Sequence, residues 1–322
     1  MIVAFSLVVP LFLIIGLGYT AVRTGLMTDA YITALDRFVF TFAMPALLFR
    51  SLAITEIPAE LPWGLWLGYY CAMLGLWAIG FILARIVLKR TLRDAIIIGF
   101  GAGQGNTVML GIPIILTGFG EEAGVPLFLL LVFHGLILIT LATFLLEATA
   151  PNAQADEGPS SSFWRTAWEG LKSSARNPVL IGLAFGAVYG QLGLAIPGPV
   201  DRALEMLGGA AIPAALFVVG GVLTRYQVRH SIAAASMTSL LKLIGMPAAV
   251  YCLSAYVFAL PPLWVAVSTV LAGMPTGVYS SILANRFQVA PDAASSTVVL
   301  GTGLSIITLS TLVAIFLQTL PG

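Results

Sequence analysis

The sequence has 322 residues, of which 59% are hydrophobic and only 9% charged. Because soluble domains carry about 25% charged residues, this composition excludes an ordinary soluble globular protein. The 15 Lys and Arg and the 14 Asp and Glu leave a net charge of +1. The chain therefore lacks the excess of positive charge that would indicate nucleic acid as a partner. Cys71 and Cys252 lie in apolar runs and form neither a disulfide framework nor a metal-ligand motif.

Apolar runs divide the chain into ten segments that are long enough to cross a membrane. A helix needs about 20 residues to span a hydrocarbon core of about 30 Å. In chain order the segments are 1–22, 32–52, 62–84, 95–120, 123–146, 177–200, 203–224, 232–258, 263–284 and 293–322. The first segment has neither the basic region nor the cleavage site of a signal peptide, so we interpret it as a helix of the mature protein. The sequence predicts an all-α, multi-pass protein of the cell inner (plasma) membrane.

The basic residues predict the orientation. With the N-terminus outside, 12 of the 15 Lys and Arg fall in inside loops. The inside residues are Arg23, Arg37, Arg85, Lys89, Arg90, Arg93, Arg165, Lys172, Arg176, Arg225, Arg229 and Arg286. Outside loops hold only Arg50 and Arg202, and Lys242 lies within a helix. By the positive-inside rule, both termini face outward.

A polar stretch separates the first five segments from the last five. Residues 148–162 read ATAPNAQADEGPSSS, and Phe163, Trp164, Trp168 and Leu171 follow at helical spacing among basic residues. This pattern predicts a flexible inside linker and a short amphipathic helix on the membrane surface. The alternative is a solvated loop with incidental aromatic residues. We therefore expect a five-helix unit over 1–147, a cytoplasmic linker over 148–176 and a second unit over 177–322.

The two units resemble each other. The motifs IIGL at 14–17, DR at 36–37 and AMPALLF at 43–49 recur as LIGL at 180–183, DR at 201–202 and AIPAALF at 211–217. The offsets are 166, 165 and 168 residues. Because five is odd, the second copy enters the membrane from the opposite side. The sequence thus predicts an inverted repeat, a common basis of secondary transporters.

The fourth and ninth segments carry glycine and proline at equivalent positions, since an offset of 170 residues pairs Gly105-Asn106 with Pro275-Thr276. Both helices are predicted to break and cross there, and broken backbone in a membrane lines a cavity. The exposed N–H groups of the helix ends suit a carboxylate. Close packing alone also uses glycine, but it does not predict this repeat equivalence. The candidate substrate-binding residues are Gln104, Gly105, Asn106, Thr107, Pro275, Thr276 and Gly277.

Two ionisable residues are candidates for charge or proton coupling. Lys242 lies ten residues into the eighth segment, where a cation costs about 2.5 to 3.5 kcal/mol on insertion scales. It either neutralises a substrate carboxylate from a distance or exchanges a proton. The structural alternatives are snorkelling to the inside face and capping the carbonyls of a broken helix. His134 in the fifth segment is either a proton relay or a hydrogen-bonded packing residue.

Several motifs lie in the order found in one transporter family. Arg37-Phe38-Val39 with Phe42-Ala43-Met44-Pro45 resembles the second helix of the auxin efflux carrier family, which includes plant auxin carriers and bacterial organic-acid carriers. Gly105 to Pro113 resembles its fourth-helix motif. Arg176-Asn177-Pro178 is similar to the start of its sixth helix, and Ala272 to Gly277 to its ninth. The motifs span nearly the whole chain.

This resemblance implies helices 4 and 9 that cross and a core of helices 3, 4, 5, 8, 9 and 10. The core would move as an elevator against scaffold helices 1, 2, 6 and 7, which would also form a homodimer. Family substrates are small organic anions: auxin in plants, and malate or malonate among bacterial relatives. Asn106 and Pro275 match the family's fourth-helix asparagine and ninth-helix proline. Gly105 and Thr276 depart from its proline and glutamine.

We therefore expect a secondary active transporter of mono- or dicarboxylates, or of auxin-like acids. It needs no cofactor, although Na+ or H+ is a candidate coupling ion. The alternatives are an anion channel, or an ion-coupled symporter or antiporter for a different solute; saturation and counterflow distinguish a carrier from a channel. An enzyme is not expected, because the sequence offers neither a nucleophile with a base nor a metal cluster.

Overall fold

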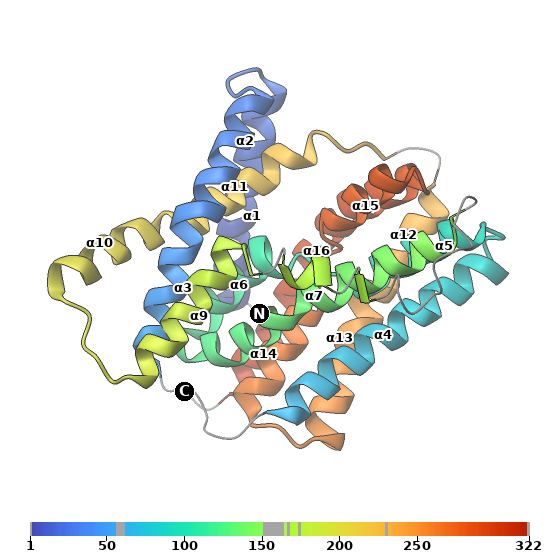
Figure 1. Cartoon of the computed structure of the whole chain (residues 1–322). Coiled ribbons are helices and arrows are strands. Elements are labelled where there is room, and N and C mark those ends of the chain that lie inside the picture. The colour runs from blue at the N-terminus through green and yellow to red at the C-terminus, as the bar shows by residue number, and fades with distance from the viewer. Residues whose placement is uncertain are drawn as a thin grey trace.

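The computed structural model describes residues 2–55, 62–150, 164–165, 168–172, 175–228 and 231–320. Every element within these ranges is helical (Figure 1). The one strand-like feature among them is an isolated antiparallel bridge between Gly105 and Thr276. The predicted all-α architecture is therefore confirmed.

The first half of the chain consists of long uninterrupted helices and of shorter helices that are joined by π-helical turns or by non-helical residues. They are α1 (Ile2–Arg23), α2 (Asp29–Phe38), η1 (Val39–Ala43), α3 (Met44–Ala53), α4 (Trp63–Ile86), α5 (Leu92–Gly103), η2 (Thr107–Gly111), α6 (Ile112–Phe119), η3 (Glu121–Ala123) and α7 (Gly124–Ala148). The π-helical turn η1 joins α2 to α3 just before Pro45. Because proline lacks an N–H, it cannot continue the regular bonding pattern of the preceding turn.

The second half follows the linker. Its helices are α9 (Pro178–Gln191), α10 (Gly198–Gly209), α11 (Ala211–Leu223), α12 (Ile232–Leu240), η4 (Leu241–Gly245), α13 (Met246–Cys252), η5 (Leu253–Val257), α14 (Pro262–Ala272), α15 (Tyr279–Phe287) and α16 (Pro291–Thr319). Residues 164–165 and 168–172 are also helical, and Trp164 and Trp168 are exposed, as the amphipathic interpretation expects. Phe163, residues 151–162 and Arg229 lie outside the described residues.

Seven helices of the described residues are long and apolar enough to cross a membrane, and 107–119, 178–191 and 262–272 form shorter apolar helices. The sixth predicted segment, 177–200, was too long. Its helix ends at Gln191, because Gly193 adopts a left-handed conformation with a φ of 64° and the chain then turns at Pro197. The following helix begins at Gly198, earlier than predicted.

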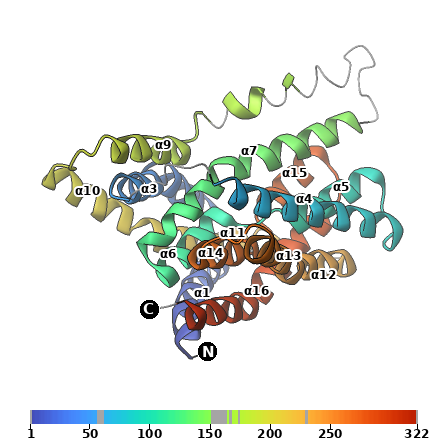
Figure 2. The same ribbon diagram turned by 90° about the horizontal axis from the view of Figure 1, so that it is seen from below.

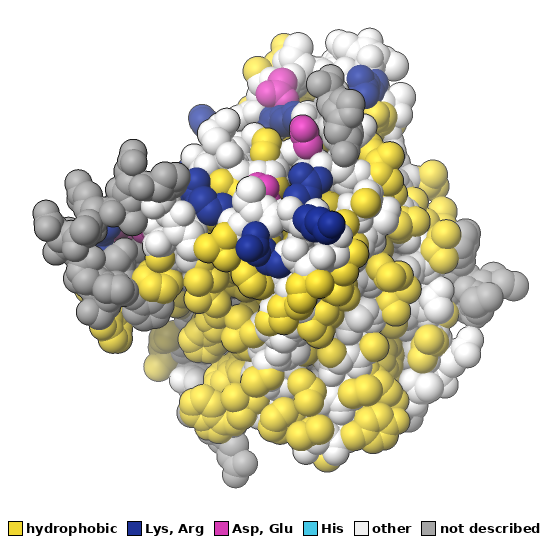
Figure 3. Space-filling model, turned by 90° about the vertical axis from the view of Figure 1, so that its right-hand side faces the viewer, with side chains coloured by type: hydrophobic (Ala, Val, Ile, Leu, Met, Phe, Trp, Pro, Cys, Tyr) yellow, Lys and Arg dark blue, Asp and Glu magenta, His cyan; other side chains and the backbone are white. Residues whose placement is uncertain are grey.

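In the view of Figure 3, hydrophobic side chains dominate the lower part of the surface, and the Lys and Arg side chains that can be seen lie in its middle and upper parts. Fully buried apolar residues such as Met44, Tyr69, Phe100 and Leu271 come from both halves of the chain and form one core. A broad apolar area without charged side chains on this face is the expected exterior of a protein surrounded by lipid.

The repeated motifs pack against each other across the two halves. The helix α1 lies along α11, and α3 lies along α9. A Cβ atom at Gly182 would lie 2.7 Å from the Pro45 carbonyl oxygen, and one at Gly186 would lie 2.5 Å from that of Phe49. Small residues let membrane helices approach closely enough for dispersion contacts to hold them together.

The close contact between α1 and α11 gives a testable prediction. A Cβ at Gly18 would overlap the backbone oxygen of Phe217, whereas one at Gly16 would meet nothing within 4 Å. We expect Gly18→Ala to lower the free energy of unfolding by about 2 kcal/mol or more, because the two helices must separate. Gly16→Ala is the matched control, and it should be neutral or stabilise by up to about 1 kcal/mol. Equal thermal midpoints for the two variants in detergent would contradict this packing.

Two ion pairs join the α2–α3 segment to the α10–α11 segment. Arg50 of α3 donates to both carboxylate oxygens of Asp201, with Nε–Oδ1 at 2.7 Å and a second nitrogen–oxygen distance of 3.3 Å. At the other end, Arg225 Nε lies 2.6 Å from Asp29 Oδ1. The two segments are thus paired by charge at both ends as well as by packing between them.

Candidate substrate-binding site

The first interruption of a membrane helix lies between α5 and η2. Thr91 caps the start of α5, because its hydroxyl accepts from the Asp94 backbone N–H at 3.1 Å. It ends at Gly103, and Gln104 is extended with a ψ of 126°. The chain becomes helical again at Thr107. The Gln104 N–H still donates to the Phe100 carbonyl, and the Asn106 carbonyl accepts from the next helical turn, so the groups left for other partners include the Asn106 N–H.

The second interruption lies between α14 and α15. The helix α14 ends at Ala272, and α15 begins at Tyr279. Pro275 sits in the middle of the non-helical stretch, where it has no N–H to donate. Gly273 on one side of it and Gly277 on the other add backbone freedom.

The two interruptions bond directly to each other. The Asn106 N–H donates to the Pro275 carbonyl at 2.8 Å, beside the bridge between Gly105 and Thr276. The Thr276 hydroxyl donates to the Gly101 carbonyl at 2.8 Å. Buried backbone groups that a broken helix leaves open are thereby satisfied within the protein, as a membrane interior requires.

Gln104 holds this junction together. Its Oε1 accepts from the Gly277 N–H at 2.9 Å, and its Nε2 donates to the Gly105 carbonyl at 2.9 Å. The side chain is 5% exposed. A Cβ at Gly277 would lie 2.5 Å from Gln104 Nε2, so a larger residue there would displace the Gln104 amide from the junction. Gln104 was predicted to contact substrate, and the structure shows it bonded to the backbone on both sides of the junction.

Asn106 differs from Gln104, because its side chain is half-buried and makes no hydrogen bond to another described residue. Thr107 beside it is 3% exposed. The structure thus brings Gln104, Gly105, Asn106, Thr107, Pro275, Thr276 and Gly277 together at one place. Within that group the Asn106 amide and the Thr107 hydroxyl make no hydrogen bond to another described residue, and the Asn106 side chain is the more exposed of the two.

Lys242 is completely buried, so it does not snorkel to a membrane face. Its Nζ donates to the carbonyl of Ala272, the last residue of α14, at 2.6 Å. The capping alternative therefore describes its contact, because carbonyls at a helix C-terminus carry partial negative charge. A Cβ at Gly105 would lie 3.2 Å from Lys242 Nζ, which places the ammonium against the first interruption as well.

His134 of α7 is also buried near the junction. Its ring packs edge-on against Tyr69 of α4 with centroids 5.8 Å apart. Lys242 is close enough for an electrostatic interaction, and the Gly105 carbonyl lies in range without the geometry of a hydrogen bond. The Tyr69 hydroxyl has no partner among the described residues. Sequence reasoning missed Tyr69, since a tyrosine in an apolar helix carries no signal of its partner.

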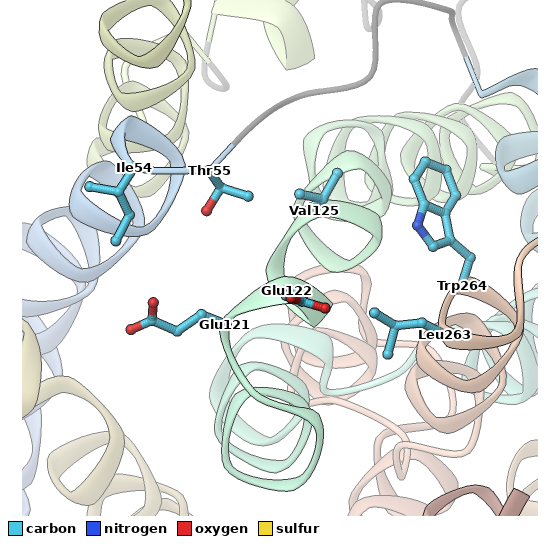
Figure 4. A pocket seen from close by; sticks show the side chains of 7 residues that line it. All are labelled: Ile54, Thr55, Glu121, Glu122, Val125, Leu263 and Trp264. Carbon is cyan, nitrogen blue, oxygen red and sulfur yellow. The ribbon is translucent and has the colours of Figure 1, made fainter. Parts of the chain in front are cut away.

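A crevice of about 490 Å³ lies apart from the junction, where α3 ends and α14 begins (Figure 4). It is lined by Ile54, Thr55, Glu121, Glu122, Val125, Leu263 and Trp264. The carboxylates of Glu121 and Glu122 are its charged groups, and none of these lining residues is basic. Because like charges repel, this crevice is unsuited to hold an organic anion, and the junction is the better candidate.

Long apolar helices, together with two shorter ones that are interrupted and bonded to each other at their breaks, are an arrangement found in membrane transport proteins. The family model described as "Membrane transport protein" matches residues 3–313. The chain therefore belongs to this family, that of the auxin efflux carriers, and the resemblance found in the sequence motifs is confirmed.

Named relatives cover nearly the whole chain. It is 25% identical over 305 residues to a "Putative malonate transporter" of Rhizobium meliloti, covering 95% of this chain and 93% of the relative. It is 26% identical over 306 residues to an "Uncharacterized transporter" of Methanothermobacter thermautotrophicus, covering 94% and 95%. It is 24% identical over 349 aligned positions to "Auxin efflux carrier component 8" of Arabidopsis thaliana, covering 92% of each.

Proposed function

We propose that this protein is a secondary active transporter of small organic anions, in particular mono- or dicarboxylates. The observation that carries the proposal is the junction itself, where the available Asn106 amide and the buried Lys242 cation meet at the ends of broken helices. The N-terminal ends of η2 and α15, which follow the two interruptions, carry positive partial charge that favours an anion. A relative named a malonate transporter supports the carboxylate class.

The proposed mechanism is elevator-type alternating access. Ten membrane crossings would form two inverted five-helix repeats, with helices 4 and 9 crossing at the junction and both termini outside the inner membrane. Helices 1, 2, 6 and 7 correspond to α1, α2–α3, α9 and α10–α11, which pack tightly through glycines. This packing supports a rigid scaffold. The homodimer that this scaffold would form is proposed from the family resemblance. The remaining helices would carry the substrate as one core.

Lys242 and His134 have a proposed role in charge coupling. The Lys242 ammonium would offset part of the negative charge of a bound carboxylate, in addition to capping α14. In a region of low dielectric constant such an interaction is much stronger than in water. His134 lies within electrostatic range of the same ammonium and would act as a proton relay if transport is coupled to H+. Na+ is the other candidate coupling ion.

A substrate screen followed by a flux assay tests this function. Purified protein is heated with malonate, malate, monocarboxylates and an auxin-like acid, each with and without Na+. A ligand at a hundred times its Kd stabilises the folded state by about 2.7 kcal/mol, so we expect a higher thermal midpoint for one class of carboxylate. In proteoliposomes the same anion should show saturable uptake and counterflow. Flux without saturation or counterflow would instead indicate an anion channel, and failure of every carboxylate to bind would refute the substrate class.

A further inference from the structure

The carbonyl end of α14 is bonded to a cation of the protein itself. Backbone N–H groups of residues 273–274 donate to the carbonyls of residues 269–271. The carbonyl of Ala272, the last residue of α14, instead accepts from Lys242 Nζ at 2.6 Å. Lys242 belongs to the turn η4, which continues into α13, and α13 lies beside α14 (Figure 2). The ammonium therefore lies where the negative partial charge of the helix end is concentrated.

In transporters with interrupted helices, such a helix end is a place for a coupling ion. Carbonyls of unwound backbone and of half-helix C-terminal ends coordinate Na+ or H+, whereas half-helix N-terminal ends face the anionic substrate. Both kinds of end meet at the junction of this protein, since α14 ends there and η2 and α15 begin just after the interruptions. The Lys242 ammonium thus occupies a position suited to a coupling cation.

The offset of 170 residues between the two interruptions extends to the turns outside them. It pairs Lys89 with Ala259, whose φ values are 51° and 45°, and Gly120 with Ala290, whose φ values are 79° and 44°. All four residues are left-handed, which is uncommon for residues other than glycine. The offset therefore relates turns of the same conformation in the two halves, and it can be used to compare positions between them.

A carbonyl near the end of a broken helix does not by itself require a charged donor. Near the end of α5, the neutral Thr276 hydroxyl donates to the Gly101 carbonyl at 2.8 Å. The same offset pairs Lys242 with Ala72 of α4, which is buried and carries no charge. The cation is thus present in one half and absent at the matching position of the other. Its charge therefore indicates a function of the site rather than a general need of interrupted helices.

The charge of Lys242 is not neutralised by a carboxylate. The ion pairs printed by the structure's described residues join Arg50 to Asp201 and Arg225 to Asp29, and none of them includes Lys242. An ammonium has several N–H donors, of which one bonds to the Ala272 carbonyl. The group also lies against Gly105 of the first interruption. A buried positive charge in this position attracts an anion to the junction, as a bound Na+ would.

We propose that the Lys242 ammonium is a built-in substitute for a coupling cation, so that anion binding at the junction does not require Na+. This inference rests on the proposed function and removes Na+ from its two candidate coupling ions. H+ remains, with His134 as its proposed relay. Because a tethered cation stays with the protein, the affinity for the anion does not vary with the concentration of Na+.

Replacing Lys242 with alanine tests the cation position without any solute, because the shorter side chain opens that position to ions from solution. Purified wild type and Lys242→Ala are unfolded by heat in NaCl and in choline chloride of equal ionic strength. We expect the thermal midpoint of Lys242→Ala to be at least about 2 °C higher in NaCl, because an ion that binds only the folded state stabilises it. The wild-type midpoint should be the same in both salts.

Two further variants are matched controls. Lys242→Met has a side chain of similar length without the charge, so it fills the position and should gain no stability from Na+. Lys172→Ala removes an exposed lysine far along the chain from the junction and should behave as the wild type. The proposal is overturned if Na+ does not stabilise Lys242→Ala, if it stabilises Lys242→Met equally, or if it stabilises the wild type.

Anion binding gives a second measurement. We expect the wild-type affinity for the anion found by screening to agree within about twofold in NaCl and choline chloride, and that of Lys242→Ala to rise at least about tenfold when Na+ replaces choline. A wild-type affinity that requires Na+ would overturn the proposal even if Lys242→Ala does not fold. If no carboxylate binds to the wild type, the proposed function fails, whereas the thermal measurement still decides whether the cation position exists.

Discussion

Replacing Asn106 with alanine is expected to lower the affinity for the transported anion by about 10- to 150-fold, because a hydrogen bond to a charged group is worth about 1.5 to 3 kcal/mol. The protein should still fold. The bond between the two interruptions uses the Asn106 backbone N–H and the Pro275 carbonyl, neither of which the substitution removes. Isothermal titration with the anion found by screening measures the effect, and the thermal midpoint without ligand reports the fold.

Asn285→Ala is the control for this experiment. The Asn285 amide bonds to the Ser281 carbonyl within its own helix at 2.8 Å, away from the junction, so its loss should leave the affinity unchanged. Unchanged affinity in Asn106→Ala would remove Asn106 from the site. Equal losses in both variants would show that the junction responds to distant changes rather than to contact with the anion.

A pair of substitutions at Lys242 separates its two roles. Lys242→Gln keeps a donor that can reach the Ala272 carbonyl but removes the charge, whereas Lys242→Met removes both. We expect both variants to lose at least about tenfold in anion affinity, since the counter-charge is gone in each. The thermal midpoints should differ, because only Lys242→Met leaves the buried carbonyl without a partner, at a cost of about 1 to 3 kcal/mol.

The readout is anion binding together with thermal unfolding at several salt concentrations. Lys242→Arg, which retains the charge, should keep more anion affinity than either neutral variant if the larger guanidinium is accommodated. Wild-type affinity in Lys242→Gln would show that the ammonium has no electrostatic role and only caps α14. Loss of binding in Lys242→Met alone would lead to the same conclusion.

Much of this fold follows from patterns that are local in the sequence. Apolar runs identify the membrane helices, because the length of a run and its lack of charge are properties of neighbouring residues. The glycines up to Gly105, and Pro275 with a glycine on each side, likewise indicate places where a helix is interrupted. The end of the sixth segment was wrong because an uncharged run does not reveal the left-handed turn at Gly193.

The contacts within the candidate site could not be predicted in the same way. Gln104 bonds to Gly277 and Lys242 to Ala272, and both pairs are far apart along the chain. The sequence identifies a buried cation as costly, and it therefore predicts that a partner exists. It does not identify the partner, because a backbone carbonyl at a helix end has no sequence signature. The packing of His134 on Tyr69 could not be predicted either, because the sequence does not show which residues of two different helices meet.

The junction between the two interruptions is held by main-chain bonds and by the side chains of Gln104 and Thr276. The Asn106 side chain bonds to no other described residue, so it can change while this framework keeps its shape. The relatives named for malonate and for auxin are 25% and 24% identical to this chain. We expect substitutions at such a position to alter the choice of ligand without a new fold having to evolve around it.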